Sequence, residues 1–236
     1  MDRLSQLATL LSNARIVDLG HVLQEDMPGV PAHSRFYKMP WSSPDKGDLT
    51  THNQFIMHEH NGTHVDAPVH FFNAGEYRIC IDELPLKVFF GPCAVLNLET
   101  LDKGEAATPN HILDWENTHG RLNRGDIVLF NFGWAKLWKL MPDHLPFQRD
   151  FPGLGGDAAK LLVDRRIGMA GCDTLSIEAS THQGHPAHRA LLGNNIPIVE
   201  NLDNLAVLPS RCYFICQPLA IKDGSGSPIR PMAVIA

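Results

Sequence analysis

The chain has 236 residues, of which 44% are hydrophobic and 19% charged, and its formal net charge is −6 at pH 7. This is the composition of a globular protein long enough to bury a substantial core. The negative balance argues against nucleic acid or an anionic membrane surface as a partner, because both select clustered Lys and Arg. No run of 18 or more apolar residues is present, so no membrane-spanning segment is expected.

The cysteines and the N-terminal segment indicate a cytoplasmic protein. Residues 1–15 lack the continuous apolar stretch of a secretion signal. The five cysteines are scattered and include no C-x-x-C pair, so we expect reduced thiols packed in a core. They are Cys80, Cys93, Cys172, Cys212 and Cys216.

The first half of the chain predicts an opening helix and then mostly strands. Apolar residues at helical spacing predict an amphipathic helix over residues 4–14. Residues 28–50 contain four prolines and few apolar runs, which predicts a long loop, and long loops are often functional. Strands are expected at residues 16–19, 54–60 and 93–98.

In the second half, helices alternate with strands. Thr108 and Pro109 predict a helix start that continues to about Gly120, and Asp157 is expected to cap a helix that ends near Arg166. A third helix is expected from Pro186 to Leu192. Strands are expected at 126–132, 167–172, 196–200, 213–216 and 232–235. The alternation favours an α/β fold, and without a linker or a repeat we expect one domain over residues 1–236.

Three common catalytic or binding motifs are excluded by their context. Residues 153–158 formally fit G-x-G-x-x-A, but no buried strand precedes them, so a helix N-terminus is the better interpretation. His58-Glu59 does not begin a zinc-protease motif, because the position of the second histidine is Gly62. No G-x-S-x-G sequence supports a serine hydrolase.

Residues 58–71, HEHNGTHVDAPVHF, contain four histidines and two acidic residues. Imidazole and carboxylate groups together suit zinc, manganese or iron. An extended backbone would place His64 and Asp66 on one face, and a turn at Gly62-Thr63 could bring His60 beside them. The spacing therefore favours a divalent metal site, with a set of hydrogen-bonded, partly buried histidines as the alternative.

The segment from His60 to Phe71 resembles the signature H-x-G-T-H-x-D-x-P-x-H of the cyclase-type metal-dependent hydrolases, which include bacterial kynurenine formamidase and isatin hydrolase. Further resemblances extend over roughly residues 16–236. They are Asn131–Trp134, Asp173–Glu178, His188–Leu192 with Ile198–Leu202, and Ser227–Arg230. The resemblance implies a swivelling β/β/α architecture, with a mixed sheet and flanking helices, assembled as a homodimer or a homotetramer.

The resemblance also implies roles for individual residues. One or two zinc or manganese ions would be held by His60, His64, Asp66, His188 and Glu200, with Asp66 bridging. A metal-activated hydroxide would attack an amide, lactam or lactone carbonyl.

The other histidines receive different roles. His70 would act as the general acid or base, a role that suits a histidine beside the metal. His58 is expected to pack or to orient a ligand at most. His52 and His182 receive the same interpretation, as does His185, which is the most able of them to reach the site.

The substrate is expected to be a small molecule, such as an arylformamide or an isatin-like lactam. Phe71 and Trp134 are candidates for the pocket, as is Trp41 in the long loop. The aromatic residues of that loop could instead form an oligomer contact or anchor the loop. A non-catalytic family member that binds a metal or a small ligand is the alternative function, but the presence of all five ligands and His70 favours an enzyme.

Overall fold

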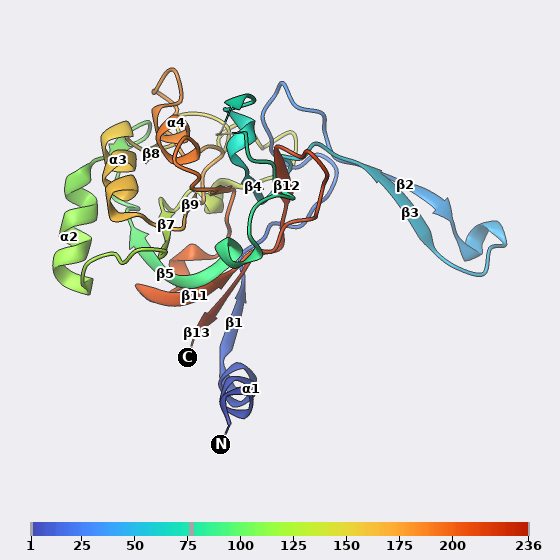
Figure 1. Cartoon of the computed structure of the whole chain (residues 1–236). Coiled ribbons are helices and arrows are strands. Elements are labelled where there is room, and N and C mark those ends of the chain that lie inside the picture. The colour runs from blue at the N-terminus through green and yellow to red at the C-terminus, as the bar shows by residue number, and fades with distance from the viewer. Residues whose placement is uncertain (1, 76–77, 236) are drawn as a thin grey trace.

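The computed structural model describes residues 2–75 and 78–235 of the chain, and within these residues nine strands form one mixed sheet (Figure 1). The central strands β5, β7, β9 and β10 are parallel, and the remaining neighbours pair antiparallel. In spatial order the strands are β1 (Arg15–Asp18), β13 (Met232–Ile235), β11 (Arg211–Ile215), β5 (Phe90–Asn97), β7 (Ile127–Asn131), β9 (Met169–Cys172), β10 (Ile198–Glu200), β4 (His64–Asp66) and β12 (Gly226–Pro228).

The sheet carries apolar side chains on both faces, so the protein has two cores. Successive side chains of a strand point to opposite faces. Val128 and Phe130 of β7 accordingly pack into one core, and Ile127 and Leu129 pack into the other. Parallel strands that are covered on both faces appear in the sequence as continuous apolar runs, which is why this strand could be predicted.

Three helices cover one face of the sheet, namely α2 (Pro109–His119), α3 (Gly156–Arg165) and α4 (Pro186–Leu192) (Figure 1). Thr108 is the N-cap of α2, as predicted. Gly155 caps α3, so the prediction that Asp157 is the cap was wrong. The helix begins at Gly156, and its cap is a glycine because a Cβ on Gly155 would lie 2.8 Å from the carbonyl oxygen of Ala107.

The predicted α/β fold with a mixed sheet and flanking helices is confirmed. All five cysteines are free thiols, and four of them are buried.

The remaining short elements are β6 (Ala106–Ala107), which pairs with β8 (Gly153–Leu154), and the 3₁₀ turns η1 (Pro44–Lys46), η2 (Pro68–His70), η4 (Leu86–Phe89), η5 (Ala135–Leu137) and η6 (Leu205–Val207).

A two-stranded arm projects from the body of the molecule (Figure 1). It consists of β2 (Tyr37–Ser42) and β3 (His52–Ile56), which pair antiparallel. The prediction of one long loop over residues 28–50 was therefore wrong at Tyr37–Ser42, and the strand predicted to reach His60 ends at Ile56. The arm packs against no core, so its sequence lacks the buried apolar run that would have indicated a strand.

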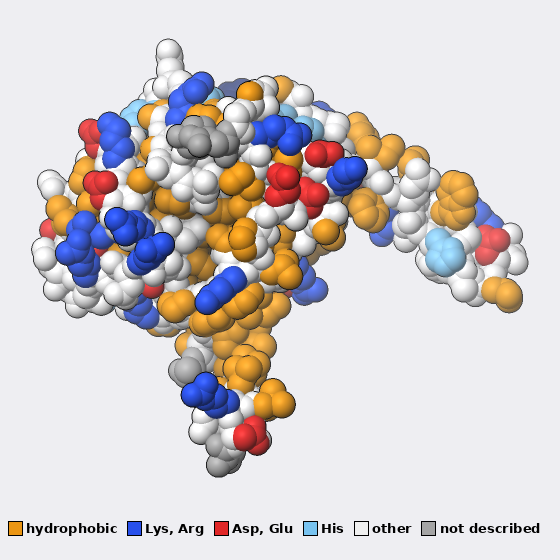
Figure 2. All heavy atoms as spheres, viewed as in Figure 1, with side chains coloured by type: hydrophobic (Ala, Val, Ile, Leu, Met, Phe, Trp, Pro, Cys, Tyr) orange, Lys and Arg blue, Asp and Glu red, His pale blue; other side chains and the backbone are white. Residues whose placement is uncertain are grey.

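The N-terminal helix α1 (Arg3–Asn13) forms a second projection (Figure 1). It was predicted from its apolar face, yet none of its residues is buried. Figure 2 shows hydrophobic side chains along both projections. Among the described residues, no helix has the length and apolar content needed to cross a membrane.

Asp173, directly after β9, holds the turn that follows β7. Its carboxylate accepts hydrogen bonds from the backbone nitrogens of Phe132, Trp134 and Ala135 at 2.8, 2.6 and 3.3 Å. Burial raises the pKa of Asp173 to about 6, so the group is ionised at mildly alkaline pH.

Replacing Asp173 with alanine should lower the free energy of unfolding by about 1–3 kcal/mol, because three backbone donors lose their carboxyl acceptor. Urea unfolding at about pH 5 is the appropriate measurement, because ionisation of Asp173 above its raised pKa costs stability and narrows the difference between wild type and variant. Asp157→Ala removes an exposed carboxylate from the first turn of α3 and should lower the free energy of unfolding by less than about 1 kcal/mol. Equal midpoints for the two variants would contradict this role for Asp173.

Candidate metal centre

The register between β4 and β10 brings acidic and histidine side chains together. The two strands are antiparallel, with His64 opposite Glu200 and Asp66 opposite Ile198. Directly opposed residues share a face of the sheet. Val65 packs into the core away from the helices, so His64 and Asp66 point toward the helical side. The His64 Nε2 atom lies 3.3 Å from Asp66 Oδ1 and 3.6 Å from Glu200 Oε2.

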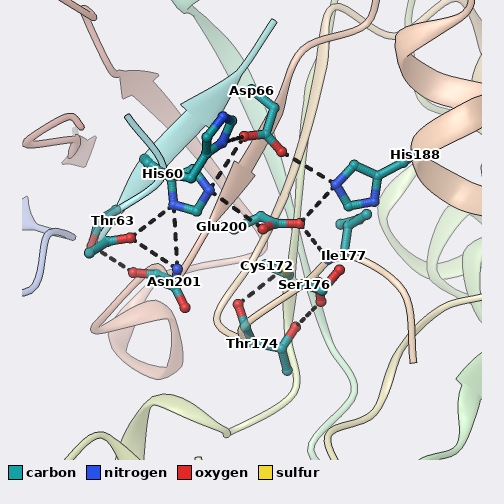
Figure 3. Close-up of polar contacts among 12 residues, drawn as sticks. His60, Thr63, Asp66, Cys172, Thr174, Ser176, Ile177, His188, Glu200 and Asn201 are labelled. Carbon is teal, nitrogen blue, oxygen red and sulfur yellow. Dashed lines mark hydrogen bonds and ion pairs between the residues drawn. The ribbon is translucent and has the colours of Figure 1, made fainter. Parts of the chain in front are cut away.

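Helix α4 supplies His188 to the same cluster. Its Nε2 atom lies 3.3 Å from Asp66 Oδ2 and 3.3 Å from Glu200 Oε1 (Figure 3). On the other side of the ring, Nδ1 lies 2.5 Å from Glu178 Oε2. Glu178 also accepts a hydrogen bond from the backbone nitrogen of His188, so this carboxylate fixes both the start of α4 and the orientation of the ring.

His60 completes the cluster from the turn that precedes β4. Its Nδ1 atom lies 2.6 Å from Asp66 Oδ1, and its Nε2 atom lies 2.9 Å from Ser225 Oγ. The ring lies against the backbone of β12, where a Cβ on Gly226 would be 2.7 Å from His60 Cε1. A glycine is therefore required at this position for the ring to fit.

The hydrogen bonds of two rings show which nitrogen atoms are available to a metal. The His64 Nδ1 atom donates to the carbonyl oxygen of Gly62 at 2.9 Å, because a carbonyl can only accept. By the same reasoning, His188 Nδ1 donates to the Glu178 carboxylate. Because Nδ1 keeps its hydrogen in both rings, each Nε2 atom faces the carboxylates with a second hydrogen or, once that hydrogen is lost, with a lone pair. A divalent cation can take the place of these hydrogens, so it fits this donor set.

Asp66 lies between the two halves of the cluster and offers one oxygen to each (Figure 3). Ligand atoms of His60, His64 and Asp66 lie within 4.8 Å of one another. Those of Asp66, His70 and His188 satisfy the same limit. The geometry could therefore hold one ion, or two that share Asp66.

The charges of the cluster shift several pKa values. Burial acts against the ionised Asp66, but His60 and His64 hold the pKa of its carboxyl well below the usual value. Burial likewise opposes protonation of His64 and His188, yet hydrogen bonds and charges from the surrounding carboxylates raise the pKa values of both imidazoles. The carboxylates thus attract positive charge, which protons or a metal ion can supply.

The cluster forms one wall of a cavity of about 600 Å³. His70, from η2, and Phe71 also line this cavity. The ring centroid of His70 lies 4.1 Å from that of His60 and 6.1 Å from that of His188. Burial lowers the pKa of His70 to about 4, which leaves its imidazole neutral at pH 7.

Comparison with known proteins agrees with this geometry. The family model described as "Putative cyclase" matches residues 17–179. The chain belongs to the cyclase family. A curated relative is a kynurenine formamidase of Bacillus cereus, which is 28% identical over 223 residues that span 91% of this chain and 94% of that protein. Isatin hydrolase of Roseibium aggregatum is 30% identical over 207 residues that span 80% of this chain and 76% of that protein.

Solved structures resemble this cyclase-family chain along nearly its whole length. Isatin hydrolase A from Labrenzia aggregata, bound to benzyl benzoate, has a TM-score of 0.91 and 31% sequence identity, with 99% of each chain covered. An isatin hydrolase bound to the product analogue thioisatinate has a TM-score of 0.92 and 27% identity, with 100% of this chain and 99% of that chain covered.

The three aromatic residues predicted for the pocket of this cyclase-family chain lie in different places. Phe71 lines the cavity and stacks on His188, with ring centroids 4.8 Å apart. Trp134 is buried in the core, where its Nε1 atom donates to the carbonyl oxygen of Phe147, and it does not line the cavity. Trp41 lies on the arm with 72% of its surface exposed, because β2 extends away from the body.

The four histidines that were expected to pack, or at most to orient a ligand, also lie in different places. His58 stacks on His33, and its Nδ1 atom accepts from the backbone nitrogen of His60. His185 lines the cavity beside His188. His52 lies at the start of β3 on the arm, and His182 lies in the turn before α4.

Several residues at the site were not predicted from the sequence. Glu178 lies in a stretch that resembles the family, but only its contact with His188 reveals its role. His33 and Gln148 line the cavity from irregular segments. No spacing in the sequence connects such segments, because tertiary packing alone brings them to the site.

Adding Zn²⁺ or Mn²⁺ to the metal-free protein at about pH 7 should release protons, because His64 and His188 have raised pKa values and a metal binds only unprotonated imidazole. Apparent affinity should therefore increase as the pH is raised from about 6 to 8. Titration calorimetry in two buffers with different ionisation enthalpies measures the released protons. Metal binding that releases none would contradict the raised pKa values.

Proposed function

We propose that this cyclase-family chain is a metal-dependent hydrolase that cleaves a small amide, lactam or lactone. The observation that carries this proposal is the convergence of imidazole nitrogen atoms on the Asp66 and Glu200 carboxylates at the wall of a cavity. Such a donor set suits zinc or manganese, with one or two ions per chain. When bound, the cation would lower the pKa of water and polarise a substrate carbonyl.

Residues of the chain supply the proton transfer in this proposal. His70 lines the cavity beside the metal-ligand cluster and belongs to the 3₁₀ turn η2. A histidine in this position can accept a proton from the attacking water and donate one to the leaving nitrogen or oxygen. We assign His70 this role and assign metal retention to His60, His64, Asp66, His188 and Glu200.

We further propose an arylformamide or an isatin-like lactam as the substrate. Apolar side chains line the cavity around the cluster, and its volume of about 600 Å³ suits a small molecule. These side chains are Val30, Phe71, Phe151 and Leu175. The names of the relatives, a kynurenine formamidase and an isatin hydrolase, support this class.

Metal analysis of the purified protein, combined with hydrolysis assays on formyl-kynurenine, isatin and simple lactones, tests the proposal. We expect bound or readily bound zinc or manganese and turnover of at least one of these substrates. Protein that retains no metal and stays inactive with added Zn²⁺ or Mn²⁺ would instead support a non-catalytic role.

The variants His64→Ala and His70→Ala should separate metal binding from proton transfer. Loss of His64 removes a ligand, so metal content and activity should fall together. Loss of His70 should leave the metal content unchanged and lower kcat by about 10²–10⁴-fold. Elemental analysis and kinetics on the same preparations provide both quantities.

Glu200→Ala should reduce the number of ions per chain or raise the metal concentration needed for activity. Unchanged metal dependence in this variant would remove Glu200 from the ligand set. Metal loss in His70→Ala would instead make His70 a ligand, as its distance from Asp66 and His188 allows.

We also propose that the chain assembles as a homodimer or homotetramer through α1 and the arm, and that it functions in the cytoplasm, where free thiols persist. A lone two-stranded ribbon and a short unpacked helix are marginal in water, so a partner surface would stabilise both. Their exposed apolar side chains support this proposal. They include Leu4, Leu7, Leu10 and Leu11 of α1, and Tyr37, Trp41, Phe55 and Ile56 of the arm.

Light scattering coupled to size exclusion should report a multiple of the 26.2 kDa chain mass for the wild type. The double variant Leu7→Glu/Trp41→Glu should shift toward the monomer, because charge replaces apolar surface in both projections. Leu113→Glu, on α2 at a distance from both projections, should leave the mass unchanged. A monomeric wild type would exclude this assembly.

A further inference from the structure

A chain of hydrogen bonds leads from His60 away from the metal-ligand cluster. His60 Nε2 lies 2.9 Å from Ser225 Oγ, which lies 2.6 Å from Glu59 Oε2. The backbone nitrogen of Ser225 donates to the same Glu59 oxygen at 3.0 Å. Ser225 directly precedes β12, and its carbonyl oxygen accepts from the backbone nitrogen of Ala67 at 2.9 Å. Both the backbone nitrogen and the carbonyl oxygen of Ser225 are therefore hydrogen-bonded, which fixes the position of the serine.

The chemistry of these groups determines which atom donates in each hydrogen bond. An ionised carboxylate accepts hydrogen bonds and donates none, so the Ser225 hydroxyl must donate to Glu59. That hydroxyl then offers a lone pair to His60, whose Nε2 atom must carry the hydrogen. Without a metal, a second hydrogen on Nδ1 would meet Asp66 Oδ1, which lies 2.6 Å away. If a cation displaced that hydrogen, Nε2 would keep its own hydrogen and Nδ1 would present its lone pair to the ion.

We propose that Glu59 and Ser225 are positioning residues for His60, which hold its hydrogen on Nε2 and leave Nδ1 free to bind a divalent cation. This inference rests on the proposed function, because it assumes that the cluster binds a metal. Outer hydrogen bonds of this kind fix the orientation of a ligating histidine and raise its basicity.

The three histidines of the cluster are oriented by different means. A backbone carbonyl orients His64, and the carboxylate of Glu178 directly orients His188. The ring of His60 depends on Ser225, 165 residues away in the sequence. Because two side chains orient His60, both can be altered without changing any ligand.

Zn²⁺ and Mn²⁺ affinities of the full-length protein, measured by chelator competition, test this inference. Ser225→Ala and Glu59→Ala should each weaken binding by about 10–100-fold, the usual effect of losing an outer hydrogen bond to a ligand. The double variant should bind little more weakly than either single variant, because the two residues act through one chain. Ser225→Thr retains the hydroxyl and should stay within a few-fold of the wild type.

Matched controls separate positioning from a general loss of structure. Ser210→Ala removes a half-buried serine beside β11, and Glu105→Gln alters an exposed glutamate, so neither should change the metal affinity. The thermal midpoint of each metal-free variant reports its stability. If Glu59→Ala fails to fold, Glu59→Gln preserves the shape, removes the charge that directs the chain, and should still weaken binding.

The outcomes distinguish this inference from the function on which it rests. Wild-type protein that binds neither ion would overturn the proposed function and this inference with it. If the wild-type protein binds metal and both Ser225→Ala and Glu59→Ala bind it with the wild-type affinity, the inference alone would be overturned. A lower thermal midpoint in the metal-free variants, with unchanged metal affinity, would mean that these hydrogen bonds only stabilise the position of β12. That result would also overturn the inference.

Discussion

The burial of the Asp66 carboxylate is the constraint on which this site depends. A buried charge is costly unless opposite charge and hydrogen bonds compensate for it. Three imidazoles face this carboxylate, and each has its far nitrogen anchored elsewhere in the fold. The anchors keep the near nitrogens of the rings directed toward Asp66, where protons or a cation can balance its charge. The negative charge at the wall of the cavity is therefore favourably placed to bind a cation.

Strand register maintains this arrangement. Strand β4 has only three residues and lies between β10 and β12, so its neighbours fix its alignment. A slip of one residue would turn Val65 toward the helices and move His64 and Asp66 into the opposite apolar core. The energetic penalty of burying those polar groups among apolar side chains opposes such a slip. The pairing that stabilises the fold therefore also defines the ligand geometry.

The parts of this picture that could be predicted from the sequence are local. The parallel core strands were predictable from their apolar runs, and the cluster of candidate ligands in residues 60–66 was predictable because one short segment holds them. His188 and Glu200 were assigned only through the family resemblance, since no local pattern joins a residue of α4 to one of β10. Ser225 was not assigned, because its contact with His60 exists only after β12 pairs with β4. The arm was missed because an element without a core lacks the burial pattern that reveals a strand.

The proposed metal ligands come from two distant segments, and this division would affect the lifetime of the protein as well as its chemistry. His188 and Asp66 are separated by 122 residues, so a cation held between them would act as a clamp on a very long loop. The free energy of metal binding would then contribute to folding, and chains without metal would be more open. Opening would expose α4 and β10 to proteases, since those elements would lose a tie to β4. The abundance of the protein in a cell would consequently follow the supply of its metal.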